Sequence, residues 1–292
     1  MRRSLLFLPG NNPNMLVNGD ILGADAVILD LEDAVAPDEK DAARILVRNA
    51  LSALDYSRVE VIIRINALDD TLFWQKDLEE VVPMRPSLIM PTKVTDAAYV
   101  QTIAAYIGKV EQRHEIPQGT VRIMPLIETA LGLENAFSIA TADSRVEALF
   151  LGAEDLTADL RCVRTKQGNE IFYARSRMVC AARAAGIDVY DTPFTDVHDD
   201  EGLIADVETS KALGFSGKAS ISPRHISAIN RIFSPTLFEV EYAREVLAAI
   251  EEALRQGKGA ASLYGKMIDA PIVNRAKQVL ANHETITGGS AR

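Results

Sequence analysis

Residues 26–33 read Ala-Val-Ile-Leu-Asp-Leu-Glu-Asp, an apolar run that ends among three carboxylates. A second run of this kind, Val-Ile-Ile-Arg-Ile at residues 61–65, also carries a charge near its end. A half-buried strand alternates apolar and polar residues, whereas these runs are apolar at nearly every position. That pattern is typical of strands buried on both faces, which indicates a parallel sheet covered by helices.

Similar runs recur along the chain and alternate with longer segments of helical periodicity. The expected strands are residues 4–9, 26–33, 59–66, 87–92, 121–128, 146–155, 188–194 and 217–222. The expected helices are residues 14–22, 38–54, 72–81, 96–115, 133–140, 170–185, 201–213 and 226–233. Eight consecutive strand–helix units favour an α/β fold of the closed (β/α)8 TIM-barrel type. An open doubly wound sheet is the alternative.

The chain continues beyond the eighth unit. We therefore divide it into a barrel at residues 1–233 and a C-terminal helical extension, or lid, at residues 234–292. Within the extension we expect a long helix over residues 239–255 that stops at Gly257-Lys258-Gly259. A C-terminal tail formed by residues 266–269 and then 272–280 should follow, with residues 285–292 frayed.

Composition and charge exclude several classes of protein. The chain has 292 residues, of which 48% are apolar and 25% charged, as in ordinary globular proteins. Its net charge is −10 and it has no cluster of Lys and Arg, so nucleic acid is not an expected partner. No apolar run approaches the roughly 20 residues of a membrane helix. The N-terminal run 5–8 is closed by Pro9-Gly10 and indicates a strand rather than a signal peptide. We expect a cytoplasmic protein.

Charged residues end several of the expected strands. In a (β/α)8 barrel the active site lies at the C-terminal ends of the strands. Asp30, Arg64, Glu128 and Asp155 stand at such ends, directly behind apolar runs. A buried charge there is costly unless it is paired or binds a metal ion. The sequence therefore predicts an active site at this end of the barrel.

Glu128 and Asp155 are the candidate metal ligands. They end neighbouring expected strands, which lie about 4.8 Å apart in a sheet. Two carboxylates at that separation repel each other unless a cation or a proton joins them. Mg²⁺ suits such a pair, and the absence of a nearby histidine argues against zinc. Alternatively, each carboxylate caps a helix or pairs with an arginine.

Arg64 is the candidate ligand for an anionic substrate, because a guanidinium grips a carboxylate with two parallel hydrogen bonds. The alternative is a structural ion pair with Asp30, Glu32 or Asp33, and both roles can hold at once. Asp30 and Glu32 share one face of the strand. We expect these two carboxylates to orient Arg64 or metal-bound water rather than to react themselves.

Several motifs occur together and in a family's order. They are Arg-Ser-Leu-Leu-Phe-Leu-Pro-Gly at 3–10, Leu-Asp-Leu-Glu-Asp at 29–33, Arg-Ile-Asn at 64–66, Pro-Leu-Ile-Glu-Thr at 125–129, Leu-Gly-Ala-Glu-Asp at 151–155, Gly-Lys at 217–218, Pro-Arg at 223–224, Ser-Pro-Thr at 234–236 and Gly-Lys-Met-Ile-Asp at 265–269. Nearly end to end, the chain resembles the citrate lyase β-subunit family of the HpcH/HpaI aldolase/citrate lyase superfamily.

The resemblance implies a (β/α)8 barrel that cleaves a C–C bond of a citryl thioester, on acyl carrier protein or coenzyme A, with Mg²⁺ as cofactor. The products would be oxaloacetate and the acetyl thioester. Glu128 and Asp155 match the Mg²⁺ ligands, with Glu128 also beside the substrate, and Arg64 matches the substrate-carboxylate residue. Asp269 matches a catalytic aspartate that relatives present to a neighbouring subunit. A homo-oligomer, a trimer or hexamer, and other citrate lyase subunits as partners are therefore implied.

One departure from the family pattern lies at the fourth strand. Relatives commonly place lysine directly after proline, whereas Thr92 here separates Pro91 from Lys93, so no site role is expected for Lys93. Two other functions remain open. One is a lyase for malyl-CoA or citramalyl-CoA, or a related thioesterase, because the same residues serve that chemistry. The other is a non-catalytic assembly subunit.

Overall fold

The computed structural model describes residues 1–69, 73–257 and 259–289. The chain divides into two compact units. One unit is Arg2–Asn230, and the other is formed by Arg231–Arg292 together with Met1. Each unit is described below by itself.

One parallel sheet organises the larger unit. Its strands in the described chain are β1 (Ser4–Pro9), β2 (Ala26–Asp30), β3 (Glu60–Ile65), β4 (Leu88–Pro91), β5 (Arg122–Ile123), β6 (Leu126–Ile127), β7 (Ala148–Leu151), β8 (Asp188–Asp191) and β9 (Gly217–Ser220). Their order across the sheet is β5-β4-β3-β2-β1-β9-β8-β7-β6. Every neighbouring pair is parallel, as the apolar runs predict.

The sheet is closed, because its two edge strands are pieces of one stretch of chain. β5 pairs with β4, and β6 pairs with β7, yet only Met124 and Pro125 separate β5 from β6. Proline has no N–H to donate, which explains the interruption. The Phe150 N–H donates to the Pro125 carbonyl at 3.0 Å and joins this stretch to β7. Because β5 and β6 together occupy one strand position, the nine strands form the predicted (β/α)8 barrel. The open-sheet alternative is wrong.

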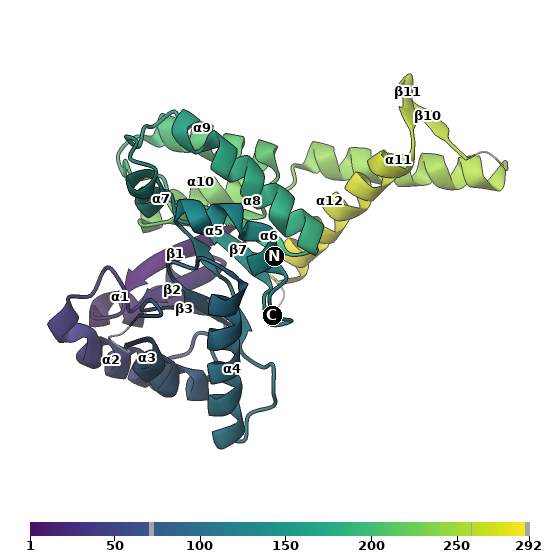
Figure 1. The fold of residues 1–292 in the computed structure, drawn as a ribbon. Coiled ribbons are helices and arrows are strands. Elements are labelled where there is room, and N and C mark those ends of the chain that lie inside the picture. The colour runs from purple at the N-terminus through teal and green to yellow at the C-terminus, as the bar shows by residue number, and fades with distance from the viewer. Residues whose placement is uncertain (70–72, 258, 290–292) are drawn as a thin grey trace. The chain divides into compact units, whose positions relative to one another are not determined.

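Helices follow the strands and cover the sheet, as Figure 1 shows for α2, α3 and α4 beside β1–β3. They are α1 (Pro13–Val17), α2 (Lys40–Ala53), α3 (Phe73–Val81), α4 (Ala97–Arg113), α5 (Ala130–Glu134), α6 (Ala136–Ala140), α7 (Ala153–Asp159), α8 (Phe172–Ala185), α9 (Asp200–Leu213) and α10 (Pro223–Phe233). Short 3-10 turns span Gly19–Ile21, Pro37–Glu39, Val82–Met84 and Asn169–Ile171. The expected first residue of α3, Leu72, falls outside the described residues.

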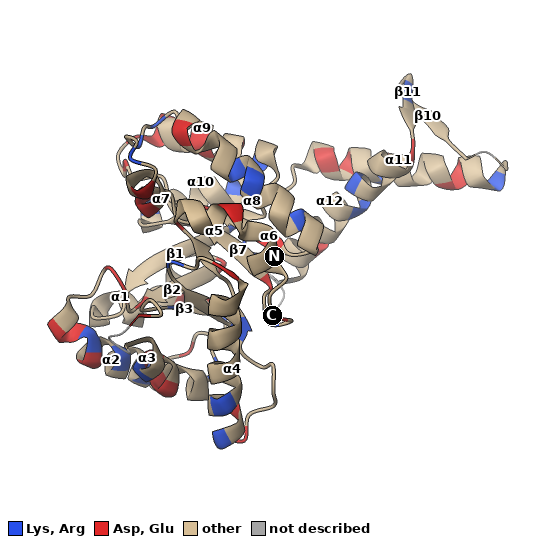
Figure 2. Cartoon of the chain, viewed as in Figure 1, with Lys and Arg blue, Asp and Glu red and all other residues tan. Residues whose placement is uncertain are grey.

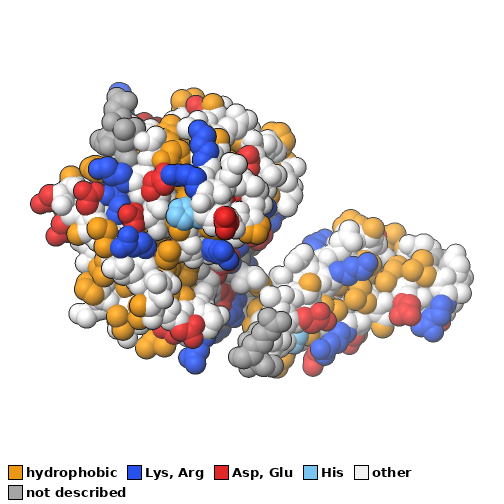
Figure 3. Space-filling model, turned by 90° about the horizontal axis from the view of Figure 1, so that it is seen from below, with side chains coloured by type: hydrophobic (Ala, Val, Ile, Leu, Met, Phe, Trp, Pro, Cys, Tyr) orange, Lys and Arg blue, Asp and Glu red, His pale blue; other side chains and the backbone are white. Residues whose placement is uncertain are grey.

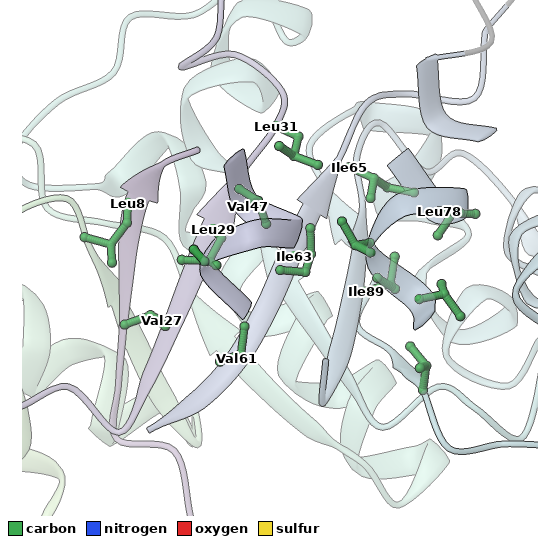
Figure 4. Close-up of a cluster of buried hydrophobic side chains, with 14 of the residues drawn as sticks. Leu8, Val27, Leu29, Leu31, Val47, Val61, Ile63, Ile65, Leu78 and Ile89 are labelled. Atoms are coloured by element: carbon green, nitrogen blue, oxygen red, sulfur yellow. The ribbon is translucent and has the colours of Figure 1, made fainter. Parts of the chain in front are cut away.

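Apolar side chains pack in two layers, one inside the barrel and one between the strands and the helices. Along β2, Ala26 and Ile28 belong to the inner layer, whereas Val27 and Leu29 belong to the outer layer. Figure 4 shows outer-layer residues of β1 to β4 facing Val47 of α2 and Leu78 of α3. Successive strand residues point to opposite faces, so both faces of the sheet are buried.

The same alternation delivers charged residues to one end of the barrel interior. Asp30 stands two residues after the inward-facing Ile28, and Arg64 stands two residues after the inward-facing Ile62. Glu128 likewise follows the inward-facing Leu126. Elsewhere, Lys, Arg, Asp and Glu lie mainly on helices and loops (Figure 2). On the face shown in Figure 3, positively and negatively charged side chains are intermingled.

A fully buried charge cluster ties β8 and β9 to α8 and α9. The Lys218 ammonium lies 2.8 Å from Asp191 and 2.7 Å from Asp206. Arg175 also reaches both carboxylates, at 2.8 and 2.6 Å. Two cations thus balance two anions, which is the condition under which buried charges are tolerated.

The C-terminal unit is a helical pair with a small hairpin, formed by α11 (Leu237–Arg255), β10 (Ala261–Leu263), β11 (Lys266–Ile268) and α12 (Ala270–Gly289). Thr236 and Glu239 form a capping box that starts α11. The hairpin was not expected, and α12 continues through residues 285–289, where fraying was expected. Lys258 and residues 290–292 lie outside the described residues. No helix in the described residues is long and apolar enough to span a bilayer.

Candidate active site

A cavity of about 490 Å³ opens at the C-terminal ends of the barrel strands. Its lining includes Asp30, Arg64, Glu128 and Asp155, which the sequence predicts as site residues, together with Phe7. All of these residues belong to the unit Arg2–Asn230. The structure therefore brings four charged side chains from distant parts of the chain to one cavity.

Arg64 is held by Asp30 in a two-pronged ion pair. Its Nε and Nη2 donate to the two carboxylate oxygens of Asp30 at 2.7 and 2.6 Å. Asp30 is almost fully buried and also accepts from the backbone N–H groups of Glu32 and Ala34. With all its contacts inside the protein, Asp30 is suited to orient Arg64 and not to bind a ligand.

Further groups fix the Arg64 side chain. Its Nη1 lies 3.2 Å from Glu32 and 3.7 Å from Asp33, and its guanidinium stands 5.1 Å from the ring centre of Phe7. Burial by itself lowers the pKa of Arg64, but Asp30, Glu32 and Asp33 outweigh it and raise the pKa. A guanidinium has five N–H donors, and only two go to Asp30. The ion-pair alternative is thus correct, and donors remain for a substrate.

Glu128 is buried, and its two oxygens differ in environment. Oε1 accepts from the backbone N–H of Lys93 at 2.7 Å, whereas Oε2 has no hydrogen-bond donor among the described residues. Burial raises the pKa of Glu128 to about 8, with the charges of Asp155 and Glu32 adding to the shift. A carboxylate held in this way favours either a proton or a cation.

Gly152 makes room for Glu128. A Cβ atom at position 152 would lie 2.8 Å from both Cβ and Oε2 of Glu128. No other residue type fits beside this carboxylate without moving it. Gly152 was named only as part of a motif and not as a site residue. A glycine that directly follows a buried strand is the signal that could have indicated the close approach of another side chain.

Asp155 does not end a strand as expected. β7 stops at Leu151, and α7 begins at Ala153, so Asp155 lies in the first turn of a helix. A carboxylate is favoured near a helix N-terminus by the orientation of the peptide dipoles. The half-buried Asp155 carboxylate forms no hydrogen bond or ion pair among the described residues and lines the cavity.

The donor set suits Mg²⁺ better than a metal that needs a full protein cage. No three His, Cys, Asp or Glu side chains of the described chain converge as a metal site. Glu128 Oε2 and the Asp155 carboxylate have no hydrogen-bond donor among the described residues, so both are open to a cation. Mg²⁺ is commonly held by one or two carboxylates, with water and substrate completing its shell. The two carboxylates therefore fit Mg²⁺.

Lys93 contacts two of the predicted site residues, although it is not among the residues that line the cavity. Its backbone N–H holds Glu128, and its ammonium donates to Glu32 Oε1 at 3.0 Å. Lys93 takes a left-handed backbone conformation, with φ of 53°, after the strand end Pro91. This turn brings the backbone N–H of Lys93 to Glu128 and its ammonium to Glu32. Burial by itself lowers the pKa of Lys93, but Glu32 reverses that effect and raises it.

Asp269 belongs to the C-terminal unit, between β11 and α12. Its Oδ1 accepts from the backbone N–H of Ile272 at 3.4 Å, and it is partly exposed. This contact accounts for a helix-capping role. The catalytic role of Asp269 stays a prediction.

Residues 3–223 match the family model described as HpcH/HpaI aldolase/citrate lyase. The chain belongs to the HpcH/HpaI aldolase/citrate lyase family. This confirms the resemblance found in its motifs.

Several known proteins of this type resemble the chain over its length. Citrate lyase subunit beta of Leuconostoc mesenteroides subsp. cremoris is 43% identical, covering 97% of this chain and 95% of that protein. A (3S)-malyl-CoA thioesterase of Cereibacter sphaeroides is 35% identical, covering 99% and 97%. The structure of protein CitE from Mycobacterium tuberculosis in complex with magnesium, acetoacetate and coenzyme A is 31% identical, with a TM-score of 0.78 and coverage of 97% and 98%.

Proposed function

We propose that this family member is a Mg²⁺-dependent carbon–carbon lyase that cleaves a citryl thioester to oxaloacetate and an acetyl thioester. One observation carries the proposal: Arg64 and two carboxylates with unpaired oxygens, Glu128 and Asp155, line one cavity. Such a cavity suits a substrate that carries a carboxylate beside an oxygen able to bind a metal ion. The greater identity to a citrate lyase β subunit than to a malyl-CoA thioesterase favours the citryl group.

Arg64 binds the carboxylate next to the C–C bond that breaks. Asp30 grips one edge of the guanidinium, so the remaining N–H groups face one fixed direction. Glu32 limits rotation from the other side. A substrate bound to a guanidinium fixed in this way is held in one orientation, which is a large part of the catalysis of a cleavage reaction.

Glu128 and Asp155 are the residues that would hold Mg²⁺. When bound there, Mg²⁺ supplies a Lewis acid for the oxygen that becomes the keto group. Glu128 presents Oε2 to the cavity, since Lys93 occupies Oε1. Asp155 presents its carboxylate from the first turn of α7. Glu128 also lies close enough to Arg64 for their charges to interact, which places substrate and cofactor ligands side by side.

Asp269 is the residue that we assign to proton exchange. As the C–C bond breaks, the substrate hydroxyl gives up its proton and becomes the keto group, and the enolate of the acetyl thioester that is left takes a proton on its methylene carbon. A carboxyl group suits this step when its pKa lies near the working pH. We further propose that Asp269 acts from a neighbouring copy of the chain in a trimer or hexamer. The thioester carrier is coenzyme A or acyl carrier protein. Other citrate lyase subunits bind the chain, which works in the cytoplasm.

A cleavage assay tests the proposed function. Purified protein with Mg²⁺ is offered citryl-CoA, malyl-CoA, citramalyl-CoA and a citryl-acyl carrier protein, and the released keto acid is measured. Glu128→Ala and Asp155→Ala are assayed in parallel, with Glu208→Ala as the control because Glu208 is a solvent-exposed carboxylate on α9 that does not line the cavity.

Each outcome has a defined meaning. Citryl cleavage that is lost in Glu128→Ala and Asp155→Ala but kept in Glu208→Ala supports the proposal. Cleavage of only malyl or citramalyl thioesters keeps the chemistry and changes the substrate, as in the thioesterase relative. A folded protein inactive on all four would favour a non-catalytic assembly subunit.

A further inference from the structure

Thr192 connects the end of one strand to the helix that carries Asp155. It directly follows β8 and lines the candidate active-site cavity, and only 1% of the residue is exposed. Its hydroxyl oxygen accepts a hydrogen bond from the backbone N–H of Ala153, the first residue of α7, at 3.2 Å. Asp155 lies two residues further along the same helix turn. A side chain at the end of β8 therefore contacts the turn that presents a candidate metal ligand.

The space that Glu128 needs explains why this acceptor comes from another strand. Ser, Thr, Asp and Asn are preferred at the N-cap of a helix, because their side chains accept hydrogen bonds from its first backbone N–H groups. The N-cap of α7 is instead Gly152, where a Cβ atom would lie 2.8 Å from Cβ and Oε2 of Glu128. A capping side chain is therefore excluded at position 152, and the Thr192 hydroxyl supplies an acceptor in its place.

The main chain of Thr192 is itself firmly held. The fully buried Lys218 ammonium donates to the Thr192 carbonyl at 2.6 Å and to Asp191 at 2.8 Å. Asp191 belongs to the buried charge cluster that ties β8 and β9 to α8 and α9. Threonine is β-branched, which restricts rotation of its side chain. The Thr192 hydroxyl is therefore a fixed point against which the first turn of α7 is placed.

The start of α7 is also linked to Glu128. The backbone N–H of Gly152 donates to the carbonyl of Ile127, the residue before Glu128, at 2.9 Å. A shift of the first turn of α7 would therefore change the separation of the Glu128 and Asp155 carboxylates. Mg²⁺ demands near-ideal octahedral geometry, so its affinity depends on that separation.

We propose that Thr192 is a positioning residue for the metal site: through Ala153 it fixes Asp155 relative to Glu128, and thereby sets the affinity for Mg²⁺. The inference rests on the proposed function, which assigns Mg²⁺ to these two carboxylates. Thr192 acts through the backbone of α7 and not by touching the metal ion or the substrate. Removing a group that orients a metal ligand typically costs 10- to 100-fold in metal affinity.

Two substitutions separate the hydroxyl from the rest of the side chain. Thr192→Val keeps the shape and removes the acceptor, whereas Thr192→Ser keeps the acceptor and removes a methyl group. Calorimetry should give a Kd for Mg²⁺ about tenfold or more higher in Thr192→Val, but close to the wild-type value in Thr192→Ser. Thr157→Val is the matched control, because Thr157 is a buried threonine whose hydroxyl donates to the Ala153 and Glu154 carbonyls within α7. Its Kd should also stay close to the wild-type value.

A second readout does not involve the metal ion. In the metal-free protein, amide hydrogen exchange at Ala153 should be faster in Thr192→Val than in the wild type or in Thr192→Ser. If Thr192→Val does not fold, Thr192→Ala replaces it, because alanine differs from serine only by the hydroxyl group.

The possible results separate this inference from the proposed function. A wild-type Mg²⁺ affinity in folded Thr192→Val would overturn the inference. Equal weakening in Thr192→Val and Thr192→Ser would also overturn it, because Thr192 would then act through packing alone. Equal weakening in Thr157→Val would overturn it as well, because any disturbance of α7 would then have the same effect. A wild-type protein that binds no Mg²⁺ would instead overturn the metal site of the proposed function, and this inference with it.

Discussion

Adding a single methyl group at Gly152 should damage the metal site without removing any ligand. In Gly152→Ala the new Cβ would lie 2.8 Å from Cβ and Oε2 of Glu128 and 3.1 Å from Cδ1 of Leu126. Carbon atoms in contact normally stay about 3.5 Å or more apart, so Glu128 must move by roughly 0.7 Å. Because φ of Gly152 is −98°, alanine causes no backbone strain, and the effect is confined to this overlap.

The size of the effect follows from that displacement. A shift approaching 1 Å in a positioned group costs on the order of 100-fold in rate. The overpacking should also lower the free energy of unfolding by about 1–3 kcal/mol. We therefore expect Gly152→Ala to stay folded, to bind Mg²⁺ about 10- to 100-fold more weakly, and to lose a comparable factor in kcat/KM at limiting Mg²⁺.

The measurement is a Mg²⁺ titration by calorimetry, combined with the cleavage assay over a range of Mg²⁺ concentrations. Circular dichroism and thermal unfolding report whether the variant is folded. Gly288→Ala is the control, since a Cβ at position 288 on α12 meets no atom within 4 Å. A folded Gly152→Ala protein with wild-type Mg²⁺ affinity and wild-type activity would refute Glu128 as a ligand.

Four further predictions concern single groups. Burial raises the pKa of Glu128 to about 8, so below that pH Mg²⁺ must displace a proton to bind. The Kd for Mg²⁺ should therefore rise about tenfold per pH unit from pH 8 to pH 6 and level off above pH 8. A Kd that stays flat over this range in calorimetry would contradict the prediction. Arg64→Lys should raise KM about tenfold or more in steady-state assays, since an ammonium cannot replace the two-pronged contact with Asp30 and the substrate together, and an unchanged KM would exclude substrate binding by Arg64. Asp269→Asn should keep its melting temperature, because asparagine caps helices as well as aspartate, but should lose about 100-fold in kcat. Mixing this variant with the inactive Glu128→Ala protein should restore activity only if Asp269 acts on a neighbouring copy. Burial disfavours the charge of Asp191, but Lys218 and Arg175 outweigh this effect and lower its pKa to about 2. The charged carboxylate should therefore add on the order of 2 kcal/mol to the free energy of unfolding above pH 4, and this contribution should be lost as the pH falls to 2. Urea unfolding of Asp191→Asn should lack this acid-dependent loss.

The sequence carried enough information for the barrel and for its charged end. Runs such as residues 26–30 and 61–65 are apolar at nearly every position because both faces of each strand are buried, and this composition is visible without a structure. The strand period of two residues also predicted that Asp30 and Glu32 share a face, and both contact Arg64. Local patterns determine such features because they depend on neighbours along the chain.

The details of the site depended on contacts between segments that are distant in sequence. The sequence placed Asp155 at a strand end, but β7 ends at Leu151 and α7 begins at Ala153, so Asp155 lies on a helix. The hairpin of β10 and β11 was missed, because strands of three residues have too little periodicity to detect.

Lys93 illustrates the limit most clearly. The family resemblance gave Lys93 no site role because Thr92 separates it from Pro91, whereas a left-handed turn brings its N–H to Glu128 and its ammonium to Glu32. By itself, the sequence determined the alternation of strands and helices and the charges that end the strands, because burial constrains composition locally. The tertiary structure decided which of those charges pair and which carboxylate oxygens have no protein donor, because these depend on where the closed barrel brings its separate strand ends together.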